Sequence, residues 1–133
     1  MTNFKQLRIW QKGFDIAVKA FKLISTFPQE ERFGLSSQIT RAAVSIPSNI
    51  AEGSSRQSEK EYSRYIDISL GSSFELETQL LIAQEISYGN AELRSELLVS
   101  LGQEQRMLTN FKKTLQKESF SQQPVAKSQR PGH

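Results

Sequence analysis

The fold is decided by residues 36–56, which read SSQITRAAVSIPSNIAEGSSR. When this stretch and the residue before it are placed at steps of about 100° around a helix axis, the larger apolar side chains share one face. That face consists of Leu35, Ile39, Ala43, Ile46 and Ile50. A helix with one strong apolar face buries it against its neighbours, so the stretch predicts one member of a helical bundle.

The same helix has a polar stripe and a proline, which a simple bundle helix does not need. The stripe consists of Gln38, Arg41, Ser45, Asn49 and Glu52. Pro47 lacks a backbone N–H and crowds the carbonyl of Ala43, so we expect a bend there. A weaker apolar arc, with Val44 and Ala51, lies roughly 130° from the main face. Two interpretations are open: the bend curves the helix around its own core, or it fits the weaker arc to a second surface.

Three other segments are predicted to be helices. Apolar residues recur at three- and four-residue steps over residues 4–26, and Pro28 ends that helix. Ser58 is a candidate N-cap for a helix over residues 59–87, and a leucine-rich stripe predicts a last helix that ends near residue 117. Gly53 is expected to end the middle helix in a left-handed conformation.

These segments predict an all-α fold, because no stretch alternates in the way a strand does. The links are short, so neighbouring helices must be antiparallel. We expect a left-handed, up-down antiparallel four-helix bundle over residues 1–117. Residues 118–133 are polar and contain two prolines and a glycine, so we expect a disordered tail there.

Composition argues against an enzyme, a metal site, a cofactor and a membrane span. The 133 residues include no cysteine, and the one histidine is His133. Neither a zinc cluster nor a Ser–His catalytic pair can be written from this set. No apolar run approaches the ~18 residues of a membrane helix, and the N-terminus lacks a signal peptide. The absence of cysteine fits a cytoplasmic protein.

Charge is distributed unevenly along the chain. Residues 1–27 contain five basic side chains against one acidic one, a net charge of +4, whereas residues 58–87 have a net charge of −4. The five basic residues are Lys5, Arg8, Lys12, Lys19 and Lys22. They are predicted to lie on one side of the first helix and to contact phosphates of RNA or DNA. Lys112, Lys113 and Lys117 extend this basic field if the end of the last helix lies near the start of the first. The alternative is that they simply keep a bundle helix soluble.

The third helix contains an unusual run of small residues, SLGSSFELE, over residues 69–77. Gly71 costs about 1 kcal/mol inside a helix relative to alanine, so we expect it to allow close approach of another backbone. Together with the weaker arc of the second helix, this run predicts a subunit interface. Arg41 is expected to pair there with Glu52, Glu75 or Glu77. The alternative for these polar residues is a solvated face.

The run from Gly34 to Arg56, together with the run from Glu61 to Leu80, resembles the four-helix bundle proteins of the 23S rRNA intervening-sequence family. The resemblance spans about residues 4–115, and its most specific part is the stretch around Pro47. It implies a homopentamer without known enzyme activity. More distant relatives include the accessory proteins of diversity-generating retroelements, which are basic pentamers that associate with nucleic acid.

Two classes of function follow for a non-catalytic oligomer. One is nucleic-acid binding, to RNA above all, that tolerates many sequences. The other is a structural or adaptor pentamer whose partner is a protein.

Overall fold

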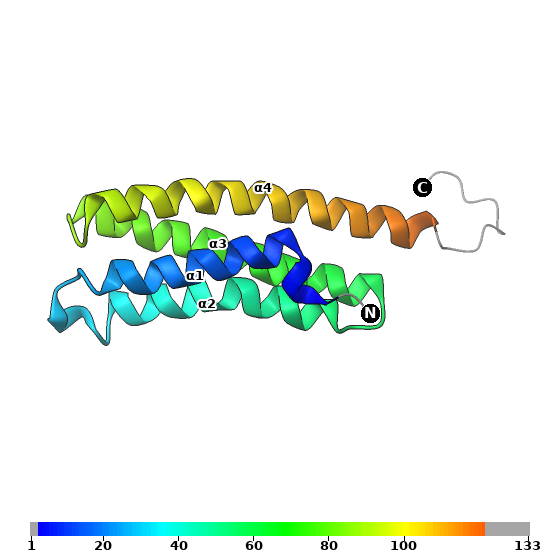
Figure 1. Cartoon of the computed structure of the whole chain (residues 1–133), viewed down its shortest axis with the longest axis horizontal. Coiled ribbons are helices and arrows are strands. Elements are labelled where there is room, and N and C mark those ends of the chain that lie inside the picture. The colour runs from blue at the N-terminus through cyan, green and yellow to red at the C-terminus, as the bar shows by residue number, and fades with distance from the viewer. Residues whose placement is uncertain (1–2, 122–133) are drawn as a thin grey trace.

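The computed structural model describes residues 3–121, with side chains as far as residue 117. Four helices form an antiparallel bundle, α1 (Arg8–Ile24), α2 (Leu35–Ser54), α3 (Glu59–Glu85) and α4 (Ala91–Ser121), as Figure 1 shows. Two short 3-10 turns, Phe4–Gln6 and Gln29–Glu31, precede α1 and α2. The described part of the chain contains no strand, so the predicted all-α four-helix fold is confirmed.

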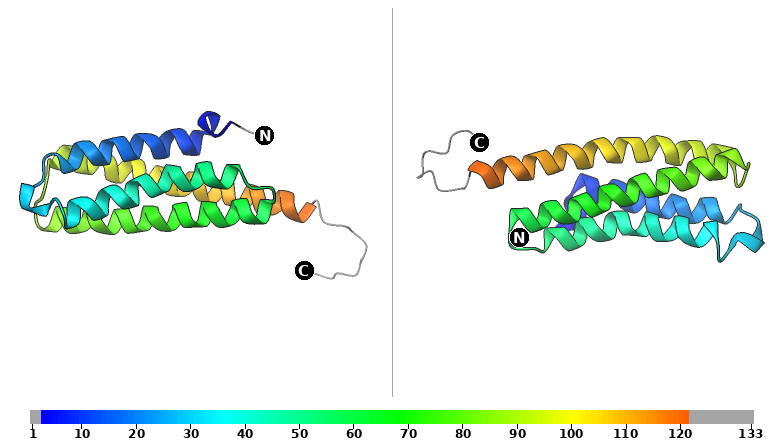
Figure 2. Two further views of the ribbon diagram at one scale, coloured as in Figure 1. Left: turned by 90° about the horizontal axis from the view of Figure 1, so that it is seen from below. Right: turned by 180° about the vertical axis from the view of Figure 1, so that it is seen from behind.

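The helices occupy the corners of a square in chain order. Each helix packs against the next, and α4 also packs against α1, whereas α1 and α3 do not touch. The helix α1 is therefore diagonal to α3 (Figure 2). The C-terminal part of α4 extends beyond the turn between α2 and α3 (Figure 1). These positions decide which side chains meet at each end of the bundle.

The core combines branched apolar side chains with a few small residues. On α2 the predicted face is confirmed, since Ile39, Ala43, Ile46 and Ile50 have no exposed surface. On α4 the buried leucines are Leu97, Leu101, Leu108 and Leu115. Burial of such side chains supplies most of the driving force for folding.

The apolar face of α1 differs from the sequence interpretation. Phe14 and Phe21, which the periodicity places on the main apolar face, remain 51% and 52% exposed. The residues that α1 buries instead are Ile9, Gly13, Ile16, Ala17, Ala20 and Leu23. The helix thus has two adjacent apolar faces, and the more aromatic one is open to solvent.

One glycine has a different role from that expected, and another supplies the left-handed turn. The predicted left-handed stop at Gly53 is wrong, because α2 continues to Ser54 and Gly53 does not have a positive φ. A Cβ at Gly53 would lie 2.8 Å from the Cβ of Tyr65, so this glycine lets α3 approach α2. The left-handed glycine is Gly89, with φ of 81°, in the turn before α4.

The remaining helix limits agree closely with those predicted from the sequence. Ser58 caps α3 as predicted, because its hydroxyl accepts a hydrogen bond from the backbone N–H of Glu61 at 3.1 Å. The helix α4 runs to Ser121, four residues past its predicted end at residue 117. The rest of the predicted tail, residues 122–133, lies outside the described residues.

Candidate functional site

One layer of contacts divides the bundle into two halves. A Cβ at Gly13 would lie 3.0 Å from Oε2 of Glu104 and 3.2 Å from Cγ2 of Ile46. The hydroxyl of Ser69 donates a hydrogen bond of 2.9 Å to the carbonyl of Ile46, and Gln105 donates one of 3.5 Å to the carbonyl of Ser73. All four helices therefore meet at this level.

Formal charge differs sharply between the two halves. The half with the α2–α3 turn, which we call the basic end, comprises residues 3–13, 46–72 and 105–117. It holds ten lysines and arginines against four carboxylates, a net charge of +6. The opposite half, residues 14–45 and 73–104, holds five against nine, a net charge of −4. In formal charge, counting Glu104 as ionised, the described part of the chain thus has one positive and one negative half.

The five basic residues predicted on the first helix are distributed over both halves of the bundle. Lys5, Arg8 and Lys12 lie in the basic end, close to the start of α1. Lys19 and Lys22 lie in the opposite half, where Lys19 forms an ion pair of 3.2 Å with Asp15. Antiparallel packing of α1 and α4 places the last turns of α4 at the same end as the start of α1.

Most of the basic end comes from residues outside the first helix, namely Arg56, Lys60, Arg64, Arg106, Lys112, Lys113 and Lys117. The sequence argument named only Lys112, Lys113 and Lys117 among them, as an extension of the basic field of the first helix. Lys112 on α4 forms an ion pair of 2.7 Å with Asp67 on α3. The sequence signal was present as basic residues on both sides of the α2–α3 turn, but only the topology joins them to the end of α4.

An aromatic side chain lies among these basic residues. The guanidinium carbons of Arg56 and Arg64 each lie 4.9 Å from the centre of the Tyr65 ring. Arg56 also pairs with Glu52 and donates a hydrogen bond of 3.2 Å to the Tyr65 hydroxyl. Cation–π contacts of this kind hold guanidinium groups in place, so the side chains of Arg56 and Arg64 are ordered at the basic end.

The polar stripe of α2 serves the chain's own packing along part of its length. The hydroxyls of Ser45 and Ser72 share a hydrogen bond of 2.7 Å, and the Asn49 amide donates to the carbonyl and hydroxyl of Ser45 at 2.8 and 2.9 Å. The interpretation of the small residues on α3 as a subunit contact is therefore wrong for Ser69, Ser72 and Ser73, which are buried within the chain.

The other polar residues predicted at the interface, from the stripe of α2 and from α3, lie at or near the surface, and Glu52 pairs with Arg56. Gln38, Arg41 and Glu75 are exposed, and Glu77 accepts a hydrogen bond of 3.0 Å from Gln105. None of the three ion pairs among the described residues includes Arg41. Arg41 thus has no acidic partner among the described residues of one chain, and its pairing at a subunit interface stays a prediction.

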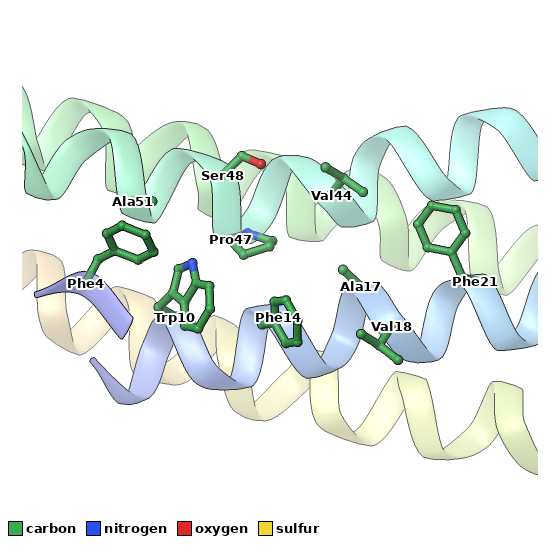
Figure 3. A pocket seen from close by; sticks show the side chains of 10 residues that line it. All are labelled: Phe4, Trp10, Phe14, Ala17, Val18, Phe21, Val44, Pro47, Ser48 and Ala51. Carbon is green, nitrogen blue, oxygen red and sulfur yellow. The ribbon is translucent and has the colours of Figure 1, made fainter. Parts of the chain in front are cut away.

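An open apolar groove of about 440 Å³ runs between α1 and α2 (Figure 3). Its walls are Phe4, Trp10, Phe14, Ala17, Val18, Phe21, Val44, Pro47, Ser48 and Ala51. Pro47 forms part of the floor, and the weaker arc predicted on α2 forms one wall. The weaker arc thus belongs to an apolar surface that the described residues leave uncovered, and the fit of a bend at Pro47 to a second surface stays a prediction.

Behind this groove lies a carboxyl group that the sequence argument missed. Glu104 has no exposed surface, and neither of its oxygens has a hydrogen-bond partner among the described residues. Burial raises the pKa of Glu104 to about 8, although the charge of Lys12 acts in the opposite direction. The signal was a polar residue within the leucine stripe of α4, between Leu101 and Leu108.

A solved structure has the same fold. It is a protein of unknown function from the S23 ribosomal protein family of Bacteroides thetaiotaomicron, with a TM-score of 0.73 and 24% sequence identity. The match covers 79% of this chain and 95% of that one. No curated protein matches the chain.

None of the helices in the described range is both long enough and apolar enough to cross a membrane. The sequence profile of the 23S rRNA-intervening sequence proteins matches residues 5–110, and this chain belongs to that family.

Proposed function

We propose that this protein is a non-catalytic homo-oligomer that binds nucleic acid, RNA above all, through its basic end and without reading base sequence. The observation that supports the proposal is the segregation of charge along the bundle, from +6 at one end to −4 in the other half. A general excess of lysine for solubility would not need this separation. Positive charge that is concentrated at one end attracts phosphate groups to that end. It causes little repulsion with the rest of the protein surface.

Unpaired basic side chains supply the contacts. Lys60, Arg64 and Lys113 are exposed and belong to none of the ion pairs formed by the described residues. Such groups contact phosphates and release counterions, which makes binding strongly dependent on salt. They position a nucleic acid without distinguishing its bases.

Assembly strengthens a weak site. The family resemblance implies a pentamer, and copies related by a rotation axis along the bundle would present their basic ends on one face. Each subunit then needs to neutralise only a few phosphates, since multivalency multiplies the effect. We place this activity in the cytoplasm, which suits a chain without cysteine.

A titration at two salt concentrations tests the proposal. Fluorescence anisotropy is measured with structured RNA and duplex DNA, using wild-type protein and the double variant Lys60→Glu/Lys113→Glu. The matched control is Lys19→Glu/Arg32→Glu, which makes the same charge change in the opposite half. We expect wild type and control to bind at low salt and the basic-end variant to lose most affinity. Equal binding by the two variants would contradict the proposal.

A second function has separate support from the apolar groove. An adaptor that holds a protein partner would need an uncovered apolar surface, and the chain has one between α1 and α2. Salt-insensitive capture of a single protein, with no RNA in the captured material, would favour this function over nucleic-acid binding.

A further inference from the structure

A second apolar surface lies on the outer side of α3. Ile68, Phe74, Leu81, Ile82 and Ile86 are 40–51% exposed there. Gly71 lies on the same side, and a Cβ at that position would meet nothing within 4 Å. We call this surface, which ends at Ile86 just past the helix, the α3 face; it combines exposed apolar side chains with a glycine, whereas the surface between α1 and α2 is a groove.

We propose that the groove of one copy receives the α3 face of a second copy of this chain. The inference rests on self-assembly as part of the proposed function, and it names the two surfaces that meet. Both surfaces are apolar, and both belong to the same chain. Exposed apolar patches of this kind on a small domain commonly mark protein contacts.

Charge at the edges favours this pairing over groove against groove. Arg41 is exposed one helical turn before Val44 of the groove and has no ion-pair partner within the described chain. Glu75 and Glu85 are exposed on α3 and are also outside its ion pairs. Two grooves in contact would bring arginine to arginine, whereas groove against α3 face brings arginine to glutamate.

The shapes of the two surfaces also favour contact between the groove and the α3 face. The bulky groove residues Phe14 and Phe21 are half exposed and need a surface that fits around them. The empty space over Gly71 lets a helix or a ring come close to the α3 backbone. The glycine that costs helix stability thereby has a use in the assembly.

Topology decides how such contacts repeat. The groove lies on the α1–α2 side of the square, and α3 is the corner diagonal to α1. The two surfaces therefore face neither the same way nor opposite ways. A heterologous contact of this geometry turns at every copy, so it excludes a two-fold dimer and a straight filament and forms a closed ring where the rotation closes.

The test uses two variants that each spoil one surface. Val44→Arg places a charge in the groove, and Phe74→Arg places one on the α3 face. We expect light scattering to report monomers for each variant alone. An equimolar mixture should form a one-to-one dimer, because one variant keeps an intact α3 face and the other an intact groove. The dimer cannot grow, since its two remaining surfaces are spoiled.

Controls separate this inference from general damage. Val99→Arg alters an apolar residue of α4 that is 62% exposed and lies outside both surfaces, and this variant should keep the wild-type mass. Circular dichroism checks that every variant is helical. A mixture that stays monomeric, or a wild-type mass for either surface variant, would overturn the pairing while leaving self-assembly in place. A monomeric wild type at micromolar concentration would instead refute assembly itself, and the RNA titration is scored independently.

Discussion

Glu104 lies directly against Gly13, with its Oε2 atom only 3.0 Å from the position that a Cβ on residue 13 would occupy. The glycine on α1 thus makes the space that a buried carboxyl group on α4 fills. The carboxyl has no hydrogen-bond partner among the described residues, and an ionised group in that position is unfavourable. The neutral acid is therefore the form that suits the folded chain.

Stability should accordingly fall as pH rises. The pKa of Glu104 is raised to about 8 from a usual value of 4.5. Between these values the folded chain holds a proton that the unfolded chain has lost, so the free energy of unfolding decreases with increasing pH. The Glu104→Gln variant lacks this term. We expect it to match wild type near pH 4.5 and to exceed it by up to about 3 kcal/mol at pH 7.

Urea denaturation of both proteins at several pH values measures this difference. Taking the difference between wild type and variant cancels the contributions of the other carboxylates. A constant difference from pH 4.5 to pH 8 would mean that Glu104 has an ordinary pKa in the folded protein.

The buried faces of the helices show how far sequence alone leads. The face of α2 was predicted correctly because its aliphatic residues fall on one line and its neighbours there are polar. On α1, two apolar faces lie side by side, and periodicity selects the more hydrophobic one. Phe14 and Phe21 outweigh Ile16 and Ala20 in such a comparison, although the smaller residues are the ones that fit between helices.

The candidate site was predicted only in part for a similar reason. Local sequence identified basic residues at the start of α1 and named those at the end of α4 as an extension, but the basic end also draws on the α2–α3 turn. Only the antiparallel topology joins those segments. Arg41 was expected to pair with an acidic residue, and in the structure it is exposed. Residue spacing alone cannot distinguish an arginine that pairs within the chain from one that remains exposed.

Gly53 should tolerate no side chain. A Cβ there would lie 2.8 Å from the Cβ of Tyr65 and 3.3 Å from the carbonyl oxygen of Tyr62. Alanine is the better helix former by about 1 kcal/mol, but overpacking against a backbone atom typically costs about 1–3 kcal/mol. We therefore expect Gly53→Ala to lower the melting temperature.

The matched control is Gly102→Ala on α4. The nearest atom that a Cβ would meet there is the end of the Arg106 side chain at 3.9 Å. Without a clash, the helix propensity of alanine should raise stability by roughly 0.5–1 kcal/mol. Opposite shifts in thermal melting would support both assignments, and a stabilised Gly53→Ala variant would mean that α2 and α3 are less closely packed than described.

Neutralising single lysines should change the salt dependence of RNA binding in a graded way. Lys113 is exposed at the basic end, so Lys113→Ala is expected to remove about one phosphate contact per chain and to make the slope of log affinity against log salt shallower. Lys22→Ala, in the opposite half, should leave the slope unchanged. The slope is measured by anisotropy at four or more salt concentrations, and an equal change for both variants would remove the basic end as the site.

Reversing Arg41 should impair assembly without unfolding the chain. Arg41 is exposed and unpaired among the described residues, so Arg41→Glu should change the stability of the isolated subunit by less than about 0.5 kcal/mol. In the assembly it would place a carboxylate opposite Glu75 or Glu85, and like charges across an interface are unfavourable. The mass from light scattering should therefore fall toward that of a monomer at low salt. Adding Glu75→Arg to the same chain exchanges the two charges and should restore the assembly, whereas adding Glu92→Arg, a charge reversal on α4, should not. Rescue by both second changes would mean that net charge rather than a specific pair controls the assembly.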